Sequence, residues 1–90
     1  AQNQNNSKLS VYPNPTNGNS VIDIENLAAV NIEVTLINIL GSKVMDLYSG
    51  VVVSKYQSID ANLTNLDKGI YFVRVNSNGN TILTDKLILK

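Results

Sequence analysis

The chain contains neither histidine nor cysteine, so it lacks the side chains that most often serve as general bases, thiol nucleophiles and zinc ligands. Nucleophilic catalysis could still use a serine beside a lysine, and Ser54–Lys55 is such a pair. Adjacent residues on a strand point to opposite faces, however, so this pair is better explained as part of a solvated loop. The sequence therefore predicts no catalytic residues and no enzymatic activity.

Two carboxylates, Asp23 and Glu25, could in principle do paired acid–base chemistry. They alternate with Ile22 and Ile24, which indicates that they lie on the wet face of a strand. Residues 14–19 offer amide oxygens to a cation but no carboxylate, whereas calcium sites usually contain two or three. Turn formation explains that loop better, and we expect no metal ion and no cofactor.

The aromatic residues give weak support to sugar binding, because there is no tryptophan, one phenylalanine and four tyrosines. Tyr71 alternates with Val73 and Val75, a pattern typical of packing in the core or at a corner. Phe72 lies on the opposite face beside Arg74, where it is either a contact within the fold or an exposed anchor. We predict no small-molecule substrate.

Seven basic and seven acidic residues cancel, and the basic residues are scattered along the chain, so we expect no nucleic-acid partner. No apolar run approaches the roughly 20 residues that span a bilayer. Residues 1–8 (AQNQNNSK) are predicted to be a polar linker. We expect one domain over residues 9–90, cut from a longer protein.

From residue 9 onward, short β-branched runs are separated by Asn, Gly, Asp and Pro. The alternation predicts strands at 9–12, 21–25, 31–39, 43–48, 70–75 and 81–89. Residues 51–59 are ambiguous, with a loop or weak edge to Lys55 followed by a short strand. Gly41 and Gly79 are predicted to occupy turns where φ is positive. The predicted core includes Ile32, Val34, Leu36, Tyr71, Val73 and Val75.

About seven strands at spacings of roughly ten residues favour an all-β fold, an immunoglobulin-like antiparallel β-sandwich. A small open barrel is the alternative. No helical periodicity is sustained anywhere in the chain.

Three segments together carry a family resemblance. They are residues 12–18 (YPNPTNG), residues 36–44 (LINILGSKV), and residues 66–75 (LDKGIYFVRV) followed by Gly79 and 86–90 (KLILK). This set resembles the type A C-terminal sorting domain of the type IX (Por) secretion system over residues 9–90. The residues that carry the structural motif are Pro13, Asn14, Pro15, Gly18, Gly41, Tyr71 and Gly79.

The resemblance implies a detachable secretion signal domain that follows an N-terminally fused cargo domain. Such a protein reaches the periplasm by the general secretory route of a Gram-negative bacterium. The type IX outer-membrane translocon and its shuttle proteins then carry it to the cell surface. A surface sortase removes the domain, here in or upstream of residues 1–8, and anchors the cargo. The end of the chain at Lys90 is expected to be the native C-terminus. A fibronectin III-like adhesion or spacer module is the alternative function.

For recognition, the predicted terminal strand is the candidate, because an edge strand leaves backbone groups available for strand addition. The residues predicted to contact the translocon are Lys86, Leu87, Ile88, Leu89 and Lys90, together with Lys68 and Gly69. The alternative is that Leu87 and Leu89 simply complete the core.

Overall fold

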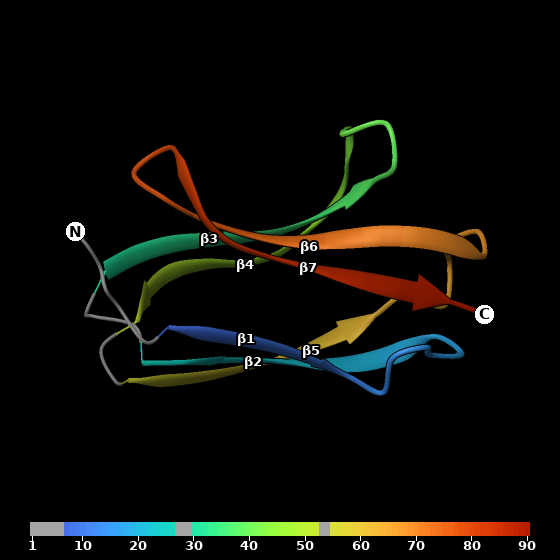
Figure 1. The fold of residues 1–90 in the computed structure, drawn as a ribbon, viewed down its shortest axis with the longest axis horizontal. Helices are drawn as coiled ribbons and strands as arrows, with labels where there is room; N and C mark the ends of the chain where they lie inside the picture. The colour runs from blue at the N-terminus through green and yellow to red at the C-terminus, as the bar shows by residue number, and fades with distance from the viewer. Residues whose placement is uncertain (1–6, 27–29, 53–54) are drawn as a thin grey trace.

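The computed structural model describes residues 7–26, 30–52 and 55–90. Its strands are β1 (Lys8–Tyr12), β2 (Asn19–Glu25), β3 (Val30–Asn38), β4 (Lys43–Val52), β5 (Tyr56–Asn62), β6 (Gly69–Ser77) and β7 (Asn80–Leu89). They form a three-stranded sheet in the order β1-β2-β5 and a four-stranded sheet in the order β4-β3-β6-β7. All strand pairs within the sheets are antiparallel. The two sheets lie face to face (Figure 1). The predicted β-sandwich is confirmed.

The inner faces of the two sheets build one hydrophobic core, as the alternating patterns predict. All six predicted core residues are buried, and five of them are completely inaccessible to solvent: Ile32, Val34, Leu36, Val73 and Val75. From the small sheet, Ile22 and Ile24 meet them, while Asp23 and Glu25 lie on the outward face. Burial of apolar area of this kind is the dominant stabilising term for a small domain.

In the ambiguous region after residue 48, the edge-strand alternative holds for residues 51–52, and the following strand is longer than predicted. Val51 and Val52 do not form a loop, because β4 continues along the edge of the sheet to Val52, which pairs with Val30 at the start of β3. The next strand does not stop at Ile59 either, since β5 continues through Asn62 in register with β2. Pairing with a neighbouring strand decided both lengths. Residues 53–54, and with them Ser54 of the predicted Ser–Lys pair, lie outside the described residues.

At the start of the chain, residues 1–6 of the predicted linker lie outside the described residues. Lys8, which was assigned to the linker, instead begins β1 and pairs with Glu25. The part of the chain that the structure describes contains no helix that could cross a bilayer.

Both predicted glycine turns are confirmed. Gly41 has a φ of 87° between β3 and β4, and Gly79 has a φ of 82° between β6 and β7. Asn78 also has a positive φ, of 54°, which gives the Asn-Gly pair the backbone of a tight hairpin turn. At Gly41 the turn is reinforced by the Asn38 side chain, whose Oδ1 accepts the backbone N–H groups of Leu40 and Ser42.

Candidate recognition surface

The segments that carry the family resemblance, apart from Gly79 in the β6–β7 turn, meet at one end of the sandwich. Gly69, which begins β6, pairs with Leu89 near the end of β7. Asn38, which precedes the Gly41 turn, pairs with Tyr71. In Figure 1 the β3–β4 turn, the start of β6, the loop between β1 and β2 and the C-terminus all lie at the same end, while the β6–β7 turn lies at the other. The predicted recognition residues are therefore neighbours in space.

The loop between β1 and β2, residues 13–18, is called the proline loop below. Its Asn14 side chain binds the outer edge of β7 at two points. Asn14 Nδ2 donates to the carbonyl oxygen of Lys86 at 2.7 Å, and Asn14 Oδ1 accepts the backbone N–H of Ile88 at 2.9 Å. One amide side chain thus replaces a segment of a neighbouring strand.

Thr16 continues this contact with its backbone. Its N–H donates to the carbonyl oxygen of Ile88 at 2.9 Å, and its carbonyl oxygen accepts the N–H of Lys90 at 2.8 Å. Thr16 and Leu89 form a short parallel bridge. The threonine is 2% exposed, and its Oγ1 holds the loop together by accepting from the Gly18 N–H and donating to the Asn19 carbonyl.

These four hydrogen bonds change the expected mode of recognition. The terminal strand does not offer the predicted open edge along residues 86–90, because the outward backbone groups of Lys86, Ile88 and Lys90 are already bonded to the proline loop. A partner could add a strand along residues 86–90 only by displacing Asn14 and Thr16. The local sequence gives no sign of this, because the bonded residues are more than seventy positions apart.

The side chains of the predicted recognition residues divide into two groups. Leu87 and Leu89 are buried in the core, at 0% and 4% exposure, so the core alternative holds for them. Ile88 is half-buried on the outward face. Exposed to solvent are Lys86, Lys90, Lys68 and Gly69. The side chains that a partner could contact are therefore Lys68, Lys86, Ile88 and Lys90.

Tyr71 and Gly18 have structural roles at this end of the molecule. Tyr71 is 8% exposed and donates its hydroxyl hydrogen to the carbonyl oxygen of Asp67 at 2.5 Å. This contact to a backbone carbonyl four residues upstream matches the tyrosine corner of immunoglobulin-like sandwiches. A Cβ at Gly18 would lie 2.7 Å from Thr64 Cγ2, because the proline loop packs closely against the residues that follow β5.

The outward face of the small sheet holds a different polar cluster around Asp23. Tyr12 donates its hydroxyl hydrogen to Asp23 Oδ2. This hydrogen bond, followed by bonds from Tyr56 and Ser58, lowers the pKa of Asp23. The same bond raises the pKa of Tyr12 to about 12, and the bond to Asp23 raises the pKa of Tyr56. Because its charged form is favoured, Asp23 is poorly suited to donate a proton as a general acid at neutral pH.

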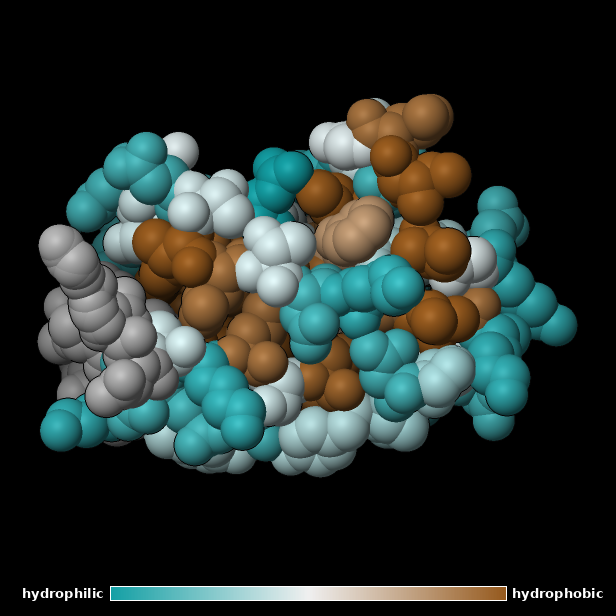
Figure 2. All heavy atoms as spheres, in the orientation of Figure 1, coloured by the Kyte–Doolittle hydropathy of each residue, from teal (hydrophilic) through white to brown (hydrophobic). Residues whose placement is uncertain are grey.

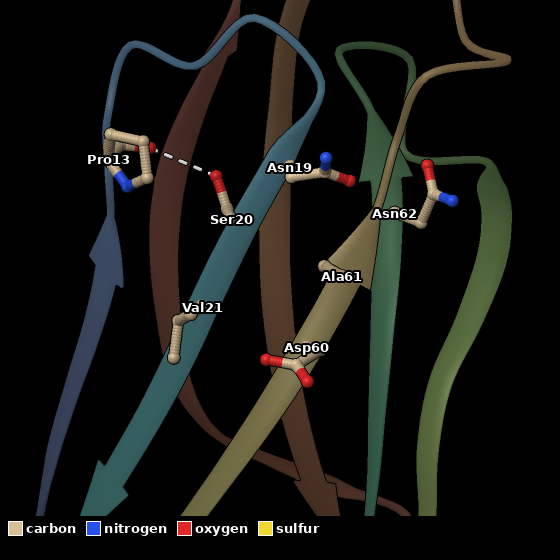
Figure 3. A pocket seen from close by; sticks show the side chains of 7 residues that line it. All are labelled: Pro13, Asn19, Ser20, Val21, Asp60, Ala61 and Asn62. Carbon is tan, nitrogen blue, oxygen red and sulfur yellow. Dashed lines mark hydrogen bonds between the residues drawn. The ribbon is translucent and has the colours of Figure 1, made fainter.

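A hollow of about 360 Å³ lies at the tip of the small sheet, and Figure 3 shows its lining. Its polar side chains are Asp60, Asn19, Asn62 and Ser20, the last of which donates to the Pro13 carbonyl at 3.0 Å. These groups do not form a nucleophile–base pair. Among the described residues, no three of His, Cys, Asp and Glu are grouped in a way that could hold a metal ion.

Two known proteins are similar to most of this chain. An ulvan lyase NLR42 from Nonlabens ulvanivorans is 32% identical over 83 residues, which cover 92% of this chain and 14% of the lyase. Among solved structures, the alkylpurine DNA glycosylase AlkC of Pseudomonas fluorescens, bound to DNA with an abasic site analog, has a TM-score of 0.57 at 18% identity. That match covers 92% of this chain and 29% of the glycosylase chain, and it shows a likeness of fold alone.

A family match covers almost the whole chain as well. The profile of the family described as "Secretion system C-terminal sorting domain" matches residues 10–90, which include the proline loop, the Tyr71 corner and the terminal strand. The chain therefore belongs to this family, the C-terminal sorting domains that serve as signals for type IX secretion.

Proposed function

We propose that this domain, called the label below, is the sorting signal of a larger exported protein. The export machinery recognises the end of the sandwich that bears the terminal strand. The cargo lies on the N-terminal side of the label. The observation that carries the proposal is the convergence of the proline loop, the start of β6 and the end of β7 in a family of sorting signals. The partners are the outer-membrane translocon, its shuttle proteins and a surface sortase.

Processing of the label belongs to the same proposal. The sortase cuts in or upstream of residues 1–8, of which those before β1 are mostly Gln and Asn, a composition that suits a linker. The cargo then stays at the surface of the Gram-negative cell or is released, and the label itself performs no catalysis. Nothing in this scheme requires a cofactor.

A fusion experiment tests the function. Residues 1–90 are joined to the C-terminus of a fluorescent protein that carries a general secretory signal, in a host with type IX secretion. We expect the reporter to reach the cell surface or the medium, and to stay in the periplasm when residues 9–90 are removed. A reporter exported equally well without residues 9–90 would contradict the proposal and favour the spacer-module function.

Deleting residues 86–90 is the direct test of the terminal strand, but it removes two core leucines and the hydrogen bonds to the proline loop. Such a label would lose its fold as well as its signal. A double substitution, Lys86→Gln with Lys90→Gln, changes exposed charge while leaving the core intact. If this variant is exported normally and the deletion is not, the partner reads the shape of the label and not these two charges.

A further inference from the structure

The outward face of the four-stranded sheet is unusually apolar near the recognition end. One row across this face runs from Lys43 on β4 through Ile37 and Phe72 to Lys86 on β7. Ile37 is only 7% exposed, yet it lies apart from the core between the sheets. The outward side of an exposed antiparallel sheet is normally polar, so a buried isoleucine there, beside Phe72 on the next strand, departs from that pattern.

Further apolar side chains extend this cluster into solvent. Ile70 is 45% exposed, Ile39 is 69% exposed and Leu40 is 85% exposed. We call the set the apolar patch: Ile37, Ile39, Leu40, Ile70, Phe72 and Ile88. Figure 2 shows hydrophobic side chains gathered on this side of the molecule, from the β3–β4 turn down towards the end of β7. Contiguous exposed apolar surface of this kind marks an interaction site more often than single exposed residues do.

A hollow adjoins the apolar patch. It has a volume of about 360 Å³ and is lined by Asn38, Ile39, Lys68, Gly69, Ile70 and Tyr71. Two of the lining side chains, Ile39 and Ile70, belong to the patch, and Lys68 places an ammonium group at its border. Clefts that take an apolar anchor side chain from a partner are the usual centres of protein–protein interfaces.

Positive charge surrounds the patch. Lys43 and Lys86 end its central row, Arg74 follows Phe72 on the same face of β6, and Lys68 lies at the hollow. Within residues 7–26, 30–52 and 55–90, Lys43–Asp46 is the only ion pair, at 3.2 Å, which leaves Arg74, Lys68 and Lys86 without a carboxylate partner. The surface thus combines an apolar centre with cations that are available for a partner.

We propose that the apolar patch is the docking surface for a protein of the export machinery whose own surface presents an apolar side chain flanked by carboxylates. The apolar side chain enters the hollow between Ile39 and Ile70, and the carboxylates meet Lys68 and Lys86. This inference rests on the proposed function and names its contact surface. A symmetric pairing of two labels through this patch would place the same cations opposite one another, which disfavours a second copy as the occupant.

Matched substitutions test the patch, because the chain offers apolar residues of similar exposure elsewhere. Ile70→Ser is compared with Ile82→Ser, whose side chains are 45% and 42% exposed, and Ile39→Ser with Val51→Ser, at 69% and 58%. We expect surface delivery of the fused reporter to fall about tenfold for each patch variant and to change less than about twofold for each control, as for an interface anchor against a neutral surface residue. Thermal unfolding of each purified label verifies that the variants remain folded.

Charge reversal gives a second, independent comparison. Lys68→Glu and Lys86→Glu should reduce delivery, whereas Lys8→Glu and Lys55→Glu, in or beside the small sheet, should not. A photo-crosslinking amino acid at position 70 should capture a protein that is absent when the translocon is deleted. The same group at position 82 should not capture it.

The outcomes separate the docking surface from the proposed function. If removal of residues 9–90 blocks export but all patch and charge variants travel normally, this inference is wrong and the function stands. If removal of residues 9–90 has no effect, the function itself fails. Concentration-dependent dimers that Ile70→Ser abolishes would overturn the inference in favour of a second copy. Flotation with anionic vesicles that Lys68→Glu abolishes would overturn it in favour of a lipid surface.

Discussion

The outward faces of the two sheets differ in the polar and apolar side chains that they present to solvent. On the small sheet, Asp23 Oδ2 accepts a hydrogen bond from the Tyr12 hydroxyl, whereas the buried Asp23 Oδ1 has no hydrogen-bond partner among the described residues. On the large sheet, Ile70 is half exposed and Arg74 has no ion pair among the described residues. The sheets share one core and the same alternation, but the outward face of the small sheet centres on a hydrogen-bonded carboxylate, whereas that of the large sheet carries the apolar patch.

This difference shows where to look for a partner surface on a domain without a catalytic site. A face whose hydrogen bonds and charges are matched within the fold gains little by binding, because each contact to a partner replaces one already made. A face with exposed apolar area and unmatched charge gains from both. This contrast supports the proposal that the large sheet carries the docking surface.

The largest expected loss of stability comes from a substitution on the inner face, and it tests which residues of β6 point inward. Val73 is completely buried, so Val73→Ala should lower the free energy of unfolding by roughly 1–3 kcal/mol through a lost contact and the cavity it leaves. Its neighbour Arg74 points outward, and Arg74→Ala should cost less. Urea unfolding measures both, and equal losses would contradict the assignment of faces.

The next effect concerns the contact between the proline loop and β7. Asn14→Asp keeps an acceptor for the Ile88 N–H but places a carboxylate oxygen against the Lys86 carbonyl, where an amide now donates. We expect a loss of about 0.5–1.5 kcal/mol, the usual net contribution of one hydrogen bond, because Asn14 is exposed and water can solvate the new carboxylate.

Amide hydrogen exchange shows which backbone groups are affected when Asn14→Asp lowers the stability. The amides of Ile88 and Lys90 should exchange faster in Asn14→Asp than in the wild type. The exposed Asn17 lies in the same loop, and Asn17→Asp serves as the control that should leave both amides protected. Equal protection in the two variants would mean that the proline loop does not cover the terminal edge in solution.

A smaller effect, with a defined pH range, concerns the polar face of the small sheet. The bond between Tyr12 and Asp23 requires a neutral hydroxyl and a charged carboxylate. Because the pKa of Asp23 is lowered in the fold, its contribution is present above the ordinary Asp value of about 3.9 and is lost as pH falls through the lowered value. Because the pKa of Tyr12 is raised to about 12, the tyrosine contribution is present below about 10 and is lost as pH rises through 12.

Tyr12→Phe removes this bond. The difference in unfolding midpoint between wild type and Tyr12→Phe should be greatest near neutral pH and should shrink at both extremes. Unfolding curves recorded across the pH range check this. A difference that stays constant with pH would mean that the tyrosine stabilises the sheet by packing alone.

The smallest effect on stability is expected for a substitution on the outward face of the large sheet, where we propose that a partner binds. Lys86 is exposed, so Lys86→Gln should change the free energy of unfolding by no more than about 0.5 kcal/mol. Any effect of this substitution on export would then come from recognition and not from unfolding. A larger loss of stability would show that the lysine contributes to the fold, which would weaken the contrast between the two faces.

The amino-acid sequence by itself determined the class of fold and the composition of the core. Alternation with a period of two assigned Ile22, Ile24, Val73 and Val75 to the inside, and the structure buries all of them. The glycines at positions 41 and 79 marked their turns because positive φ favours a residue without a Cβ. These features depend on neighbours within a few positions, which a single sequence contains.

The length of β4 and β5 and the contact of the proline loop with β7 were decided only by the tertiary structure. Strand pairing extended β4 to Val52, and Asn14 found its partners more than seventy residues away. Between two prolines, an asparagine is typical of a turn, and nothing nearby predicts that its amide will cover an edge strand. The predicted recognition residues came from a family resemblance. Which of their side chains remain accessible depended on how the loop and the two sheets pack, because burial is a property of the assembled layers and not of any one segment.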